Sequence, residues 1–128
     1  MINFLLVATI FLCQSGGPLS PMALGGKLVV ARTSWYGDEC QGQEMAYGGL
    51  FDKNDPGIAA HRTFPPGTIL KLWNITEGKD GKIEIKEAQV TIRDRGPNIE
   101  SRDLDISEAA AKRINLDGVK ALLVWVAN

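Results

Sequence analysis

The stretch VTIRDRGPNIESRDLDIS, residues 90–107, holds the most informative pattern in the chain. Val90 and Ile92 alternate with polar neighbours, and this alternation predicts a strand. A glycine and a proline follow and end that strand, so Asp94 is expected at the edge between a strand and a loop. Catalytic groups are commonly mounted at such edges of a rigid scaffold. This position makes Asp94 a candidate for chemistry.

The same stretch is crowded with charge. The charged residues close to Asp94 in sequence are Arg93, Arg95, Arg102, Asp103 and Asp105. A surface loop does not need so many mixed charges in one short segment. The residue types alone leave two interpretations open: a functional site, and a solvated corner held by salt bridges.

Length and composition indicate one ordinary globular domain. The chain has 128 residues, of which 23% are charged and 45% hydrophobic. The formal net charge is −1. A nucleic-acid binder normally has a basic excess or a basic stripe, so this function class is excluded. A neutral or weakly charged ligand such as a glycan is compatible with the balance.

Metal-ligating residues are scarce. The chain has a single histidine, His61, and two cysteines, Cys13 and Cys40. One histidine and two distant cysteines cannot form a closed zinc site without recruiting carboxylates. We therefore expect no metal and no other cofactor.

A thiol nucleophile formed by Cys40 with His61 is an alternative kind of site. A reactive thiolate needs an electropositive environment, whereas Cys40 lies in the acidic loop GDECQG. Neighbouring carboxylates raise the pKa of a thiol and weaken it as a nucleophile. The sequence therefore argues against a catalytic Cys40.

The amino-terminal residues are typical of an export signal. The apolar run INFLLVATIFLC, residues 2–13, has the length of a signal-peptide core and is too short to span a bilayer. We expect a signal peptide over 1–15, a linker over 16–26, a folded domain over 27–128, and a location in the periplasm or cell envelope. Cys13 suggests a lipid anchor, although Leu12 before it does not fit a lipoprotein signal. The alternative is a buried amino-terminal strand or helix.

Alternating and β-branched segments predict a small β-barrel with one short helix. The helix is expected over 107–114, with Ser107 as its N-cap. A hairpin tip is expected over 77–81. The clearest expected strands are residues 27–36, 68–74, 82–86 and 119–127.

Six short motifs occur in a characteristic order. They are Ser34-Trp35-Tyr36-Gly37, Phe51-Asp52, Ala59-Ala60-His61-Arg62-Thr63, Pro66-Gly67-Thr68, Asp94-Arg95-Gly96-Pro97 and Asp103-Leu104-Asp105-Ile106-Ser107. In this order they resemble the rare lipoprotein A (RlpA-like) family, from about Lys27 to Val126. The resemblance implies a mainly β fold, a six-stranded double-psi β-barrel related to expansins and to family-45 glycoside hydrolases. The hairpin around residues 77–87 is longer than the usual turn of the family.

The resemblance also implies a function. The family includes endolytic lytic transglycosylases, which cleave peptidoglycan glycan strands, preferably strands without stem peptides, and leave 1,6-anhydro-muramyl ends. The expected partner is therefore the glycan strand, and we expect the protein to be a monomer.

Three residues that match family site positions receive catalytic roles. Asp94 is the candidate acid and base, Asp52 the candidate stabiliser of positive charge on the sugar ring, and His61 the candidate to orient Asp94 or hold the glycan. We expect Asp94 and His61 to face one open groove, within direct or one-water reach. Without the motif, His61 would be interpreted as a structural histidine. Arg95 is expected to point away from Asp94 and to pair with a carboxylate such as Asp105.

Four residues are candidates for substrate binding: Trp35, Tyr36, Arg95 and Arg102. Aromatic rings beside a glycine-rich loop can stack on sugars, but packing in the core explains them equally well. Arg102 and Asp105 are also placed to brace the loop from behind.

Two functions without catalysis remain as alternatives. One is an expansin-like module that binds peptidoglycan or another polysaccharide without cleaving it. The other is a domain that only positions partner enzymes at the wall.

Overall fold

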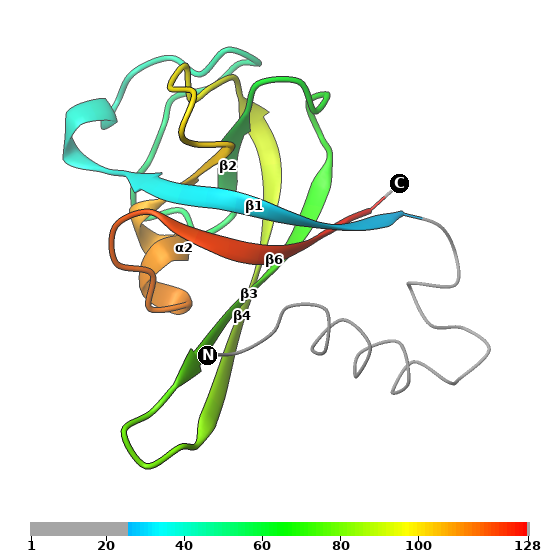
Figure 1. Ribbon diagram of the computed structural model, residues 1–128. Coiled ribbons are helices and arrows are strands. Elements are labelled where there is room, and N and C mark those ends of the chain that lie inside the picture. The colour runs from blue at the N-terminus through cyan, green and yellow to red at the C-terminus, as the bar shows by residue number, and fades with distance from the viewer. Residues whose placement is uncertain (1–25, 128) are drawn as a thin grey trace.

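Six strands close into one barrel, which carries one short α-helix (Figure 1). The computed structural model describes residues 26–127. The elements are β1 (Lys27–Tyr36), the 3-10 helix η2 (Asp38–Cys40), β2 (Ile58–His61), β3 (Ile69–Glu77), β4 (Ile83–Asp94), β5 (Leu104–Ser107), α2 (Glu108–Arg113) and β6 (Lys120–Val126). The strands follow the order β1-β5-β2-β4-β3-β6 around the barrel. The predicted fold class is confirmed.

Two of the six strand pairings are parallel. They join β1 to β5 and β2 to β4, and the other four pairings are antiparallel. β1 changes partner along its length, since residues 27–33 pair with β6 and residues 33–36 pair with β5. Parallel strands need long crossover connections. The segments between β1 and β2 and between β4 and β5 join strands that are not neighbours in the barrel, so neither is a tight hairpin.

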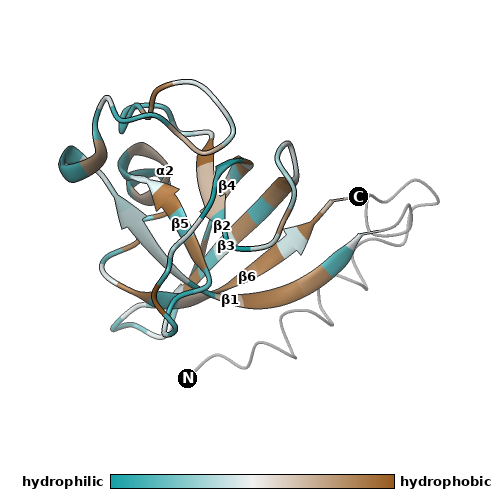
Figure 2. Cartoon of the chain, turned by 90° about the horizontal axis from the view of Figure 1, so that it is seen from above, coloured by the Kyte–Doolittle hydropathy of each residue, from teal (hydrophilic) through white to brown (hydrophobic). Residues whose placement is uncertain are grey.

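Apolar side chains fill the inside of the barrel. Ile92, Leu104, Ile106 and Leu122 are each at most 1% exposed and belong to one cluster. In Figure 2 the strand β6 is drawn largely in the hydrophobic colour, as expected for an element buried in this core. Burial of this cluster is the main favourable term in folding.

A second cluster lies on the outer side of the barrel wall. It contains Tyr36, Met45, Phe51, Ile58 and Ala60, and we call it the outer cluster. Met45 and Phe51 come from the long connection between β1 and β2, residues 37–57. This covering loop therefore packs on the wall and buries the outer faces of β1 and β2.

The hairpin of β3 and β4 is longer than the sequence predicted. The expected strands at 82–86 and around Val90 are one strand of 12 residues, β4, and β3 continues to Glu77. The pairing runs without interruption from Ile69↔Thr91 to Glu77↔Ile83, and Ala88 within it is buried. Figure 1 shows the hairpin projecting beyond the rest of the barrel.

The predicted helix is confirmed, together with its cap. The Ser107 hydroxyl accepts a hydrogen bond from the Ala110 amide at 3.3 Å and donates one to the Asp55 carbonyl at 2.6 Å. One side chain therefore starts α2 and ties it to the covering loop.

The amino-terminal expectations lie outside the described residues. They concern the signal peptide over 1–15, nearly all of the linker over 16–26, and the lipid anchor on Cys13. The first strand begins at Lys27, where the folded domain was expected to begin. Within the described residues 26–127, every helix is too short or too polar to cross a bilayer.

A pair of variants in β4 tests the assignment of the core. Ile92 is fully buried, and Ile83 on the same strand is 60% exposed. We expect Ile92→Ala to lower the free energy of unfolding by about 2–5 kcal/mol, because it leaves a cavity in the barrel. The matched control Ile83→Ala should change it by less than about 0.5 kcal/mol in urea denaturation. Equal losses from the two variants would contradict the assignment.

Candidate functional site

Asp94 reaches the outer face of the barrel through an irregularity in the sheet. β2 pairs with β4 as Ala59↔Ile92 and then as Ala60↔Asp94, so the register shifts by one residue. Ala59 and Ile92 belong to the interior cluster, whereas Ala60 belongs to the outer cluster. Strict alternation would turn Asp94 to the same face as Ile92. The shift instead places Asp94 beside Ala60, under the covering loop.

The carboxylate of Asp94 is held by two backbone amides. Its Oδ1 accepts hydrogen bonds from the Ala46 amide at 2.7 Å and the Arg95 amide at 2.9 Å. No hydrogen bond from residues 26–127 uses Oδ2. The side chain is half-buried. One carboxylate oxygen is therefore fixed, and the other is free to meet a ligand.

A second carboxylate, Asp105, lies on the other side of Ala60. The pairing Ala60↔Asp105 joins β2 to β5 at the level where Ala60↔Asp94 joins β2 to β4. The Ser34 hydroxyl donates a hydrogen bond to Asp105 and accepts one from Arg102 Nη1 at 3.1 Å. Arg102 and Asp105 are thus linked through Ser34. The resemblance pointed to Asp52 as the second acid. Asp105 is found only from the strand register, for which the sequence holds no local signal.

Arg95 points away from Asp94, as expected, but its partner differs. Its Nε donates to the Tyr47 hydroxyl at 3.3 Å, and its guanidinium lies 5.5 Å from the centre of the Tyr47 ring. The expected pairing with Asp105 is wrong, because that carboxylate takes the Ser34 hydroxyl. The guanidinium of Arg95 is exposed and stacked on an aromatic ring, so it can still meet a ligand.

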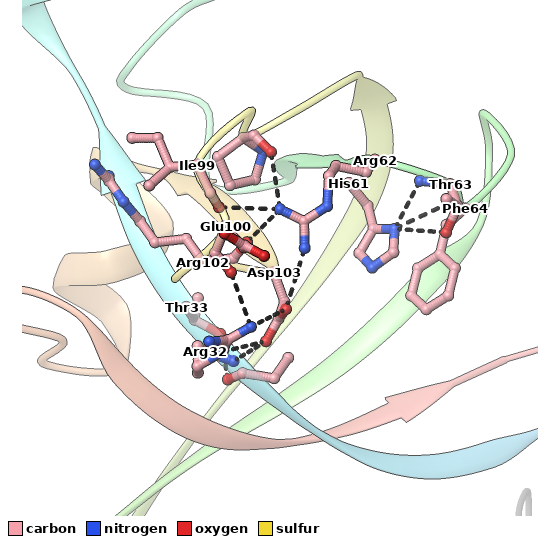
Figure 3. A network of polar contacts seen from close by, with 12 residues as sticks. Arg32, Thr33, His61, Arg62, Thr63, Phe64, Ile99, Glu100, Arg102 and Asp103 are labelled. Carbon is pink, nitrogen blue, oxygen red and sulfur yellow. Dashed lines mark hydrogen bonds and ion pairs between the residues drawn. The ribbon is translucent and has the colours of Figure 1, made fainter.

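His61 lies on the next strand end but faces the other way. It pairs with Leu104, whose side chain is in the interior cluster, whereas its neighbour Ala60 pairs with Asp94. Its Nδ1 accepts hydrogen bonds from the Thr63 and Phe64 amides, both at 3.1 Å. The ring stacks on Phe64 with a centroid distance of 3.6 Å. Figure 3 shows these two residues next to each other.

The expected groove shared by His61 and Asp94 is therefore not formed by direct contact. The two backbones are adjacent, and the two side chains have separate partners on opposite faces of the sheet. His61 lines a hollow of about 400 Å³ together with Val29, Phe64 and Asp103. Because Nδ1 is an acceptor, the neutral ring carries its proton on Nε2 and can donate it to a ligand.

Asp52 is committed to its own loop. Its Oδ1 accepts the Asn54 amide at 3.0 Å and lies 3.5 Å from Gln41 Nε2. These bonds close a turn that follows the buried ring of Phe51. The structure brings Asp52 into contact with neither Asp94 nor His61.

Trp35 and Tyr36 lie on opposite faces of β1, so they do not flank one groove. Trp35 is 38% exposed, but Tyr36 is only 8% exposed and stacks on Phe51 with a centroid distance of 4.2 Å. Tyr36 is therefore a member of the outer cluster and not an exposed platform for a sugar. The covering loop buries it, and this burial could not be predicted from the residues next to Tyr36 in the sequence.

A network of arginines braces the segment before β5 (Figure 3). Arg62 Nη1 donates to the carbonyls of Pro97, Ile99 and Arg102, and both Arg32 and Arg62 pair with Asp103. Hydrogen bonds from Arg32 lower the pKa of Asp103 to about 2. The charges around Asp103 therefore form the salt-bridged corner that was one of the two interpretations, while Asp94 stands apart from it.

Acidic and thiol groups do not gather into a metal site. Within the part of the chain that the structure describes, no three of its His, Cys, Asp and Glu side chains are placed to hold an ion. Burial is the main reason why the pKa of the Cys40 thiol is raised, and the charges of Glu39 and Asp94 raise it further. This environment disfavours a thiolate.

Comparison with known proteins identifies the family. The model of a family described as lytic transglycolase matches residues 29–122. The chain belongs to this family. A curated relative from Aquifex aeolicus, named probable endolytic peptidoglycan transglycosylase RlpA, is 38% identical over 95 residues, which cover 73% of this chain and 38% of the relative. The endolytic peptidoglycan transglycosylase RlpA of Campylobacter jejuni is 33% identical over 113 residues, covering 78% of this chain and 38% of that protein.

The lytic transglycolase domain accounts for only part of these relatives. The chain spans less than two fifths of the length of the two relatives named above. Among solved structures, Streptomyces papain inhibitor aligns with a TM-score of 0.54 and 22% identity, covering 80% of this chain and 96% of that one. That likeness concerns the fold alone.

The titration of His61 tests the orientation of its ring. Burial lowers the pKa of His61, and the neighbouring charge of Arg62 lowers it further. Protonation of Nδ1 would also break both amide bonds. We expect the midpoint of the single histidine resonance in NMR to lie below about 6.5 in the folded protein and near that value in urea. Folding stability should therefore fall as the pH drops through about 6.5, because the unfolded chain takes up the proton first. A folded midpoint above the unfolded one would contradict this arrangement.

Proposed function

We propose that this domain is an endolytic lytic transglycosylase of peptidoglycan, in which Asp94 acts first as an acid and then as a base. The observation that carries the proposal is the position of Asp94. It stands on the outer face at the shifted end of β4, with Oδ1 fixed by two amides and Oδ2 free of hydrogen bonds from residues 26–127. The family of the chain and the names of its relatives support the reaction class.

The reaction needs one carboxyl group that changes role. Protonated Asp94 gives its proton to the glycosidic oxygen while the bond from that oxygen to the anomeric carbon breaks, and positive charge grows on the muramyl ring. The resulting carboxylate then takes the proton of the muramyl 6-hydroxyl, whose oxygen bonds to the anomeric carbon. The product is a 1,6-anhydro end, no water is consumed, and Asp94 regains its proton.

The fixed oxygen supplies orientation. Because Oδ1 is bound by the Ala46 and Arg95 amides, Oδ2 is presented in one direction without loss of side-chain freedom when the glycan binds. The exposed guanidinium of Arg95 points away from Asp94, lies over the ring of Tyr47 and is a further donor for sugar hydroxyls.

His61 is suited to holding the glycan and not to orienting Asp94. Its Nδ1 is occupied by backbone amides, so Nε2–H is the donor left for a sugar hydroxyl. The proposal includes two further parts that the resemblance implies, a preference for strands without stem peptides and export to the cell envelope where such strands occur.

A binding module without catalysis is the second candidate. It is favoured by one observation, the placement of Asp94 and His61 on opposite faces of adjacent strands. Such a module would bind glycan strands and leave no new ends.

Asp94→Asn distinguishes these two functions. The substitution keeps the shape of the side chain and removes its ability to transfer a proton. We expect the wild-type chain to produce anhydro-muramyl ends from denuded strands, and the variant to lose at least about 100-fold in rate, by mass spectrometry of the products. Asp117→Asn, an exposed position after α2, is the matched control and should retain the wild-type rate. Retained activity in Asp94→Asn would refute the assignment of Asp94, and binding of strands without new ends by the wild type would favour the module.

A further inference from the structure

Tyr36 carries a hydroxyl group that the fold buries and leaves without a partner. The residue is 8% exposed, and its oxygen is the buried side-chain polar atom that finds no hydrogen bond among the described residues. A phenylalanine would fill the same space without the cost of an unpaired polar group. The hydroxyl therefore calls for an explanation other than packing.

Tyr36 lies close to the residue that separates the two carboxylates of the site. Tyr36 packs in the outer cluster with Ala60, and Ala60 is paired with Asp94 on one side and with Asp105 on the other. Since neighbouring strands are about 4.8 Å apart, the backbones of the two acids lie about 10 Å apart, with the small alanine between them. Tyr36 belongs to the same cluster as this alanine, and the negative charges of both acids act on its hydroxyl.

The surroundings keep the phenol protonated. Burial is the largest cause that raises the pKa of Tyr36, followed by the negative charges of Asp94 and Asp105. Cys40 raises it further, and the positive charge of Arg93 lowers it. At any working pH Tyr36 is thus a neutral hydroxyl that can donate a hydrogen bond to a carboxylate.

We propose that Tyr36 is a positioning residue, whose buried hydroxyl donates a hydrogen bond to the Asp94 carboxylate in the glycan complex and so steadies the charge that Asp94 acquires after giving up its proton. The proposal rests on the function proposed above. The hydrogen bond is absent in the free protein, where the Tyr36 hydroxyl has no partner, and it forms when substrate fills the site, as catalytic hydrogen bonds commonly do. Asp105 acts in the opposite sense, because its negative charge opposes a second charge on Asp94.

The pH dependence of the rate separates these two influences. The acid form of Asp94 starts the reaction, so activity falls on the alkaline side where that proton is lost. Tyr36→Phe removes a donor to the charged form, and the alkaline limb should move to higher pH while the maximal rate falls about 10- to 100-fold. Asp105→Asn removes a negative charge, and the same limb should move to lower pH. Both profiles are measured on denuded glycan strands with the full chain.

A structural role for Tyr36 predicts a different result. In that case rate and stability would fall together. Under the proposal, loss of an unpaired hydroxyl should leave the melting temperature of Tyr36→Phe unchanged or raise it while the rate falls. The matched control is Thr33→Val, which removes a buried hydroxyl from the opposite face of β1. The Thr33 hydroxyl is bonded to the Ala31 carbonyl at 3.0 Å, so this variant should lose stability and keep the wild-type pH profile.

The outcomes keep the two proposals apart. If Asp94→Asn is fully active, the proposed function fails. If Asp94→Asn is inactive while Tyr36→Phe keeps the wild-type rate and profile, only the role of Tyr36 is overturned. An unmoved alkaline limb in a slow Tyr36→Phe would overturn it as well.

Discussion

The register shift between β2 and β4 is the constraint on which the site depends. Without it, Asp94 would face the same side as Ile92 and place a charge in the apolar interior of the barrel, which is unfavourable by several kcal/mol. With it, Asp94 lies on the outer face, within reach of the Ala46 amide. The shift lies between Ala59 and Ala60 of the short strand β2. Ala59 packs into the interior of the barrel, and Ala60 packs in the outer cluster.

The covering loop depends on the same geometry. Its apolar residues Met45 and Phe51 pack on the outer faces of β1 and β2, and its backbone supplies the amide that holds Asp94. The loop also buries Tyr36 and thereby turns an aromatic side chain from a surface group into part of the site wall. One segment therefore serves both packing and the site. Displacing the loop would expose the outer cluster and would also break the hydrogen bond from the Ala46 amide to Asp94.

Most of the fold could be predicted from local patterns. Apolar alternation located β1 and β6, and Ser107 with its flanking charges located α2 within one residue of its observed ends. β5 did not stand out as a strand, because it has four residues and a charged one at its centre. The order of the strands required the family resemblance, since parallel pairing between distant segments leaves no local signal.

The sequence was sufficient to predict where the site lies along the chain, but not on which face of the sheet each of its side chains lies. The Gly-Pro after Arg95 correctly placed Asp94 at the end of a strand. A period of two then fails there, because one inserted residue reverses the side on which every later side chain lies. For that reason Asp105 was not recognised as the counterpart of Asp94 across Ala60, and His61 was expected on the wrong face.

The pairing of the first strand with the last has a mechanical consequence. Lys27 lies opposite Val126, so the two ends of the barrel chain emerge side by side (Figure 1). β1 then runs ten residues, about 33 Å, before it reaches Tyr36 beside the acids. A tether or a further module joined to either end would pull from one common anchor point at the far end of β1. The opposite end of β1, which carries Tyr36, would stay clear of that attachment.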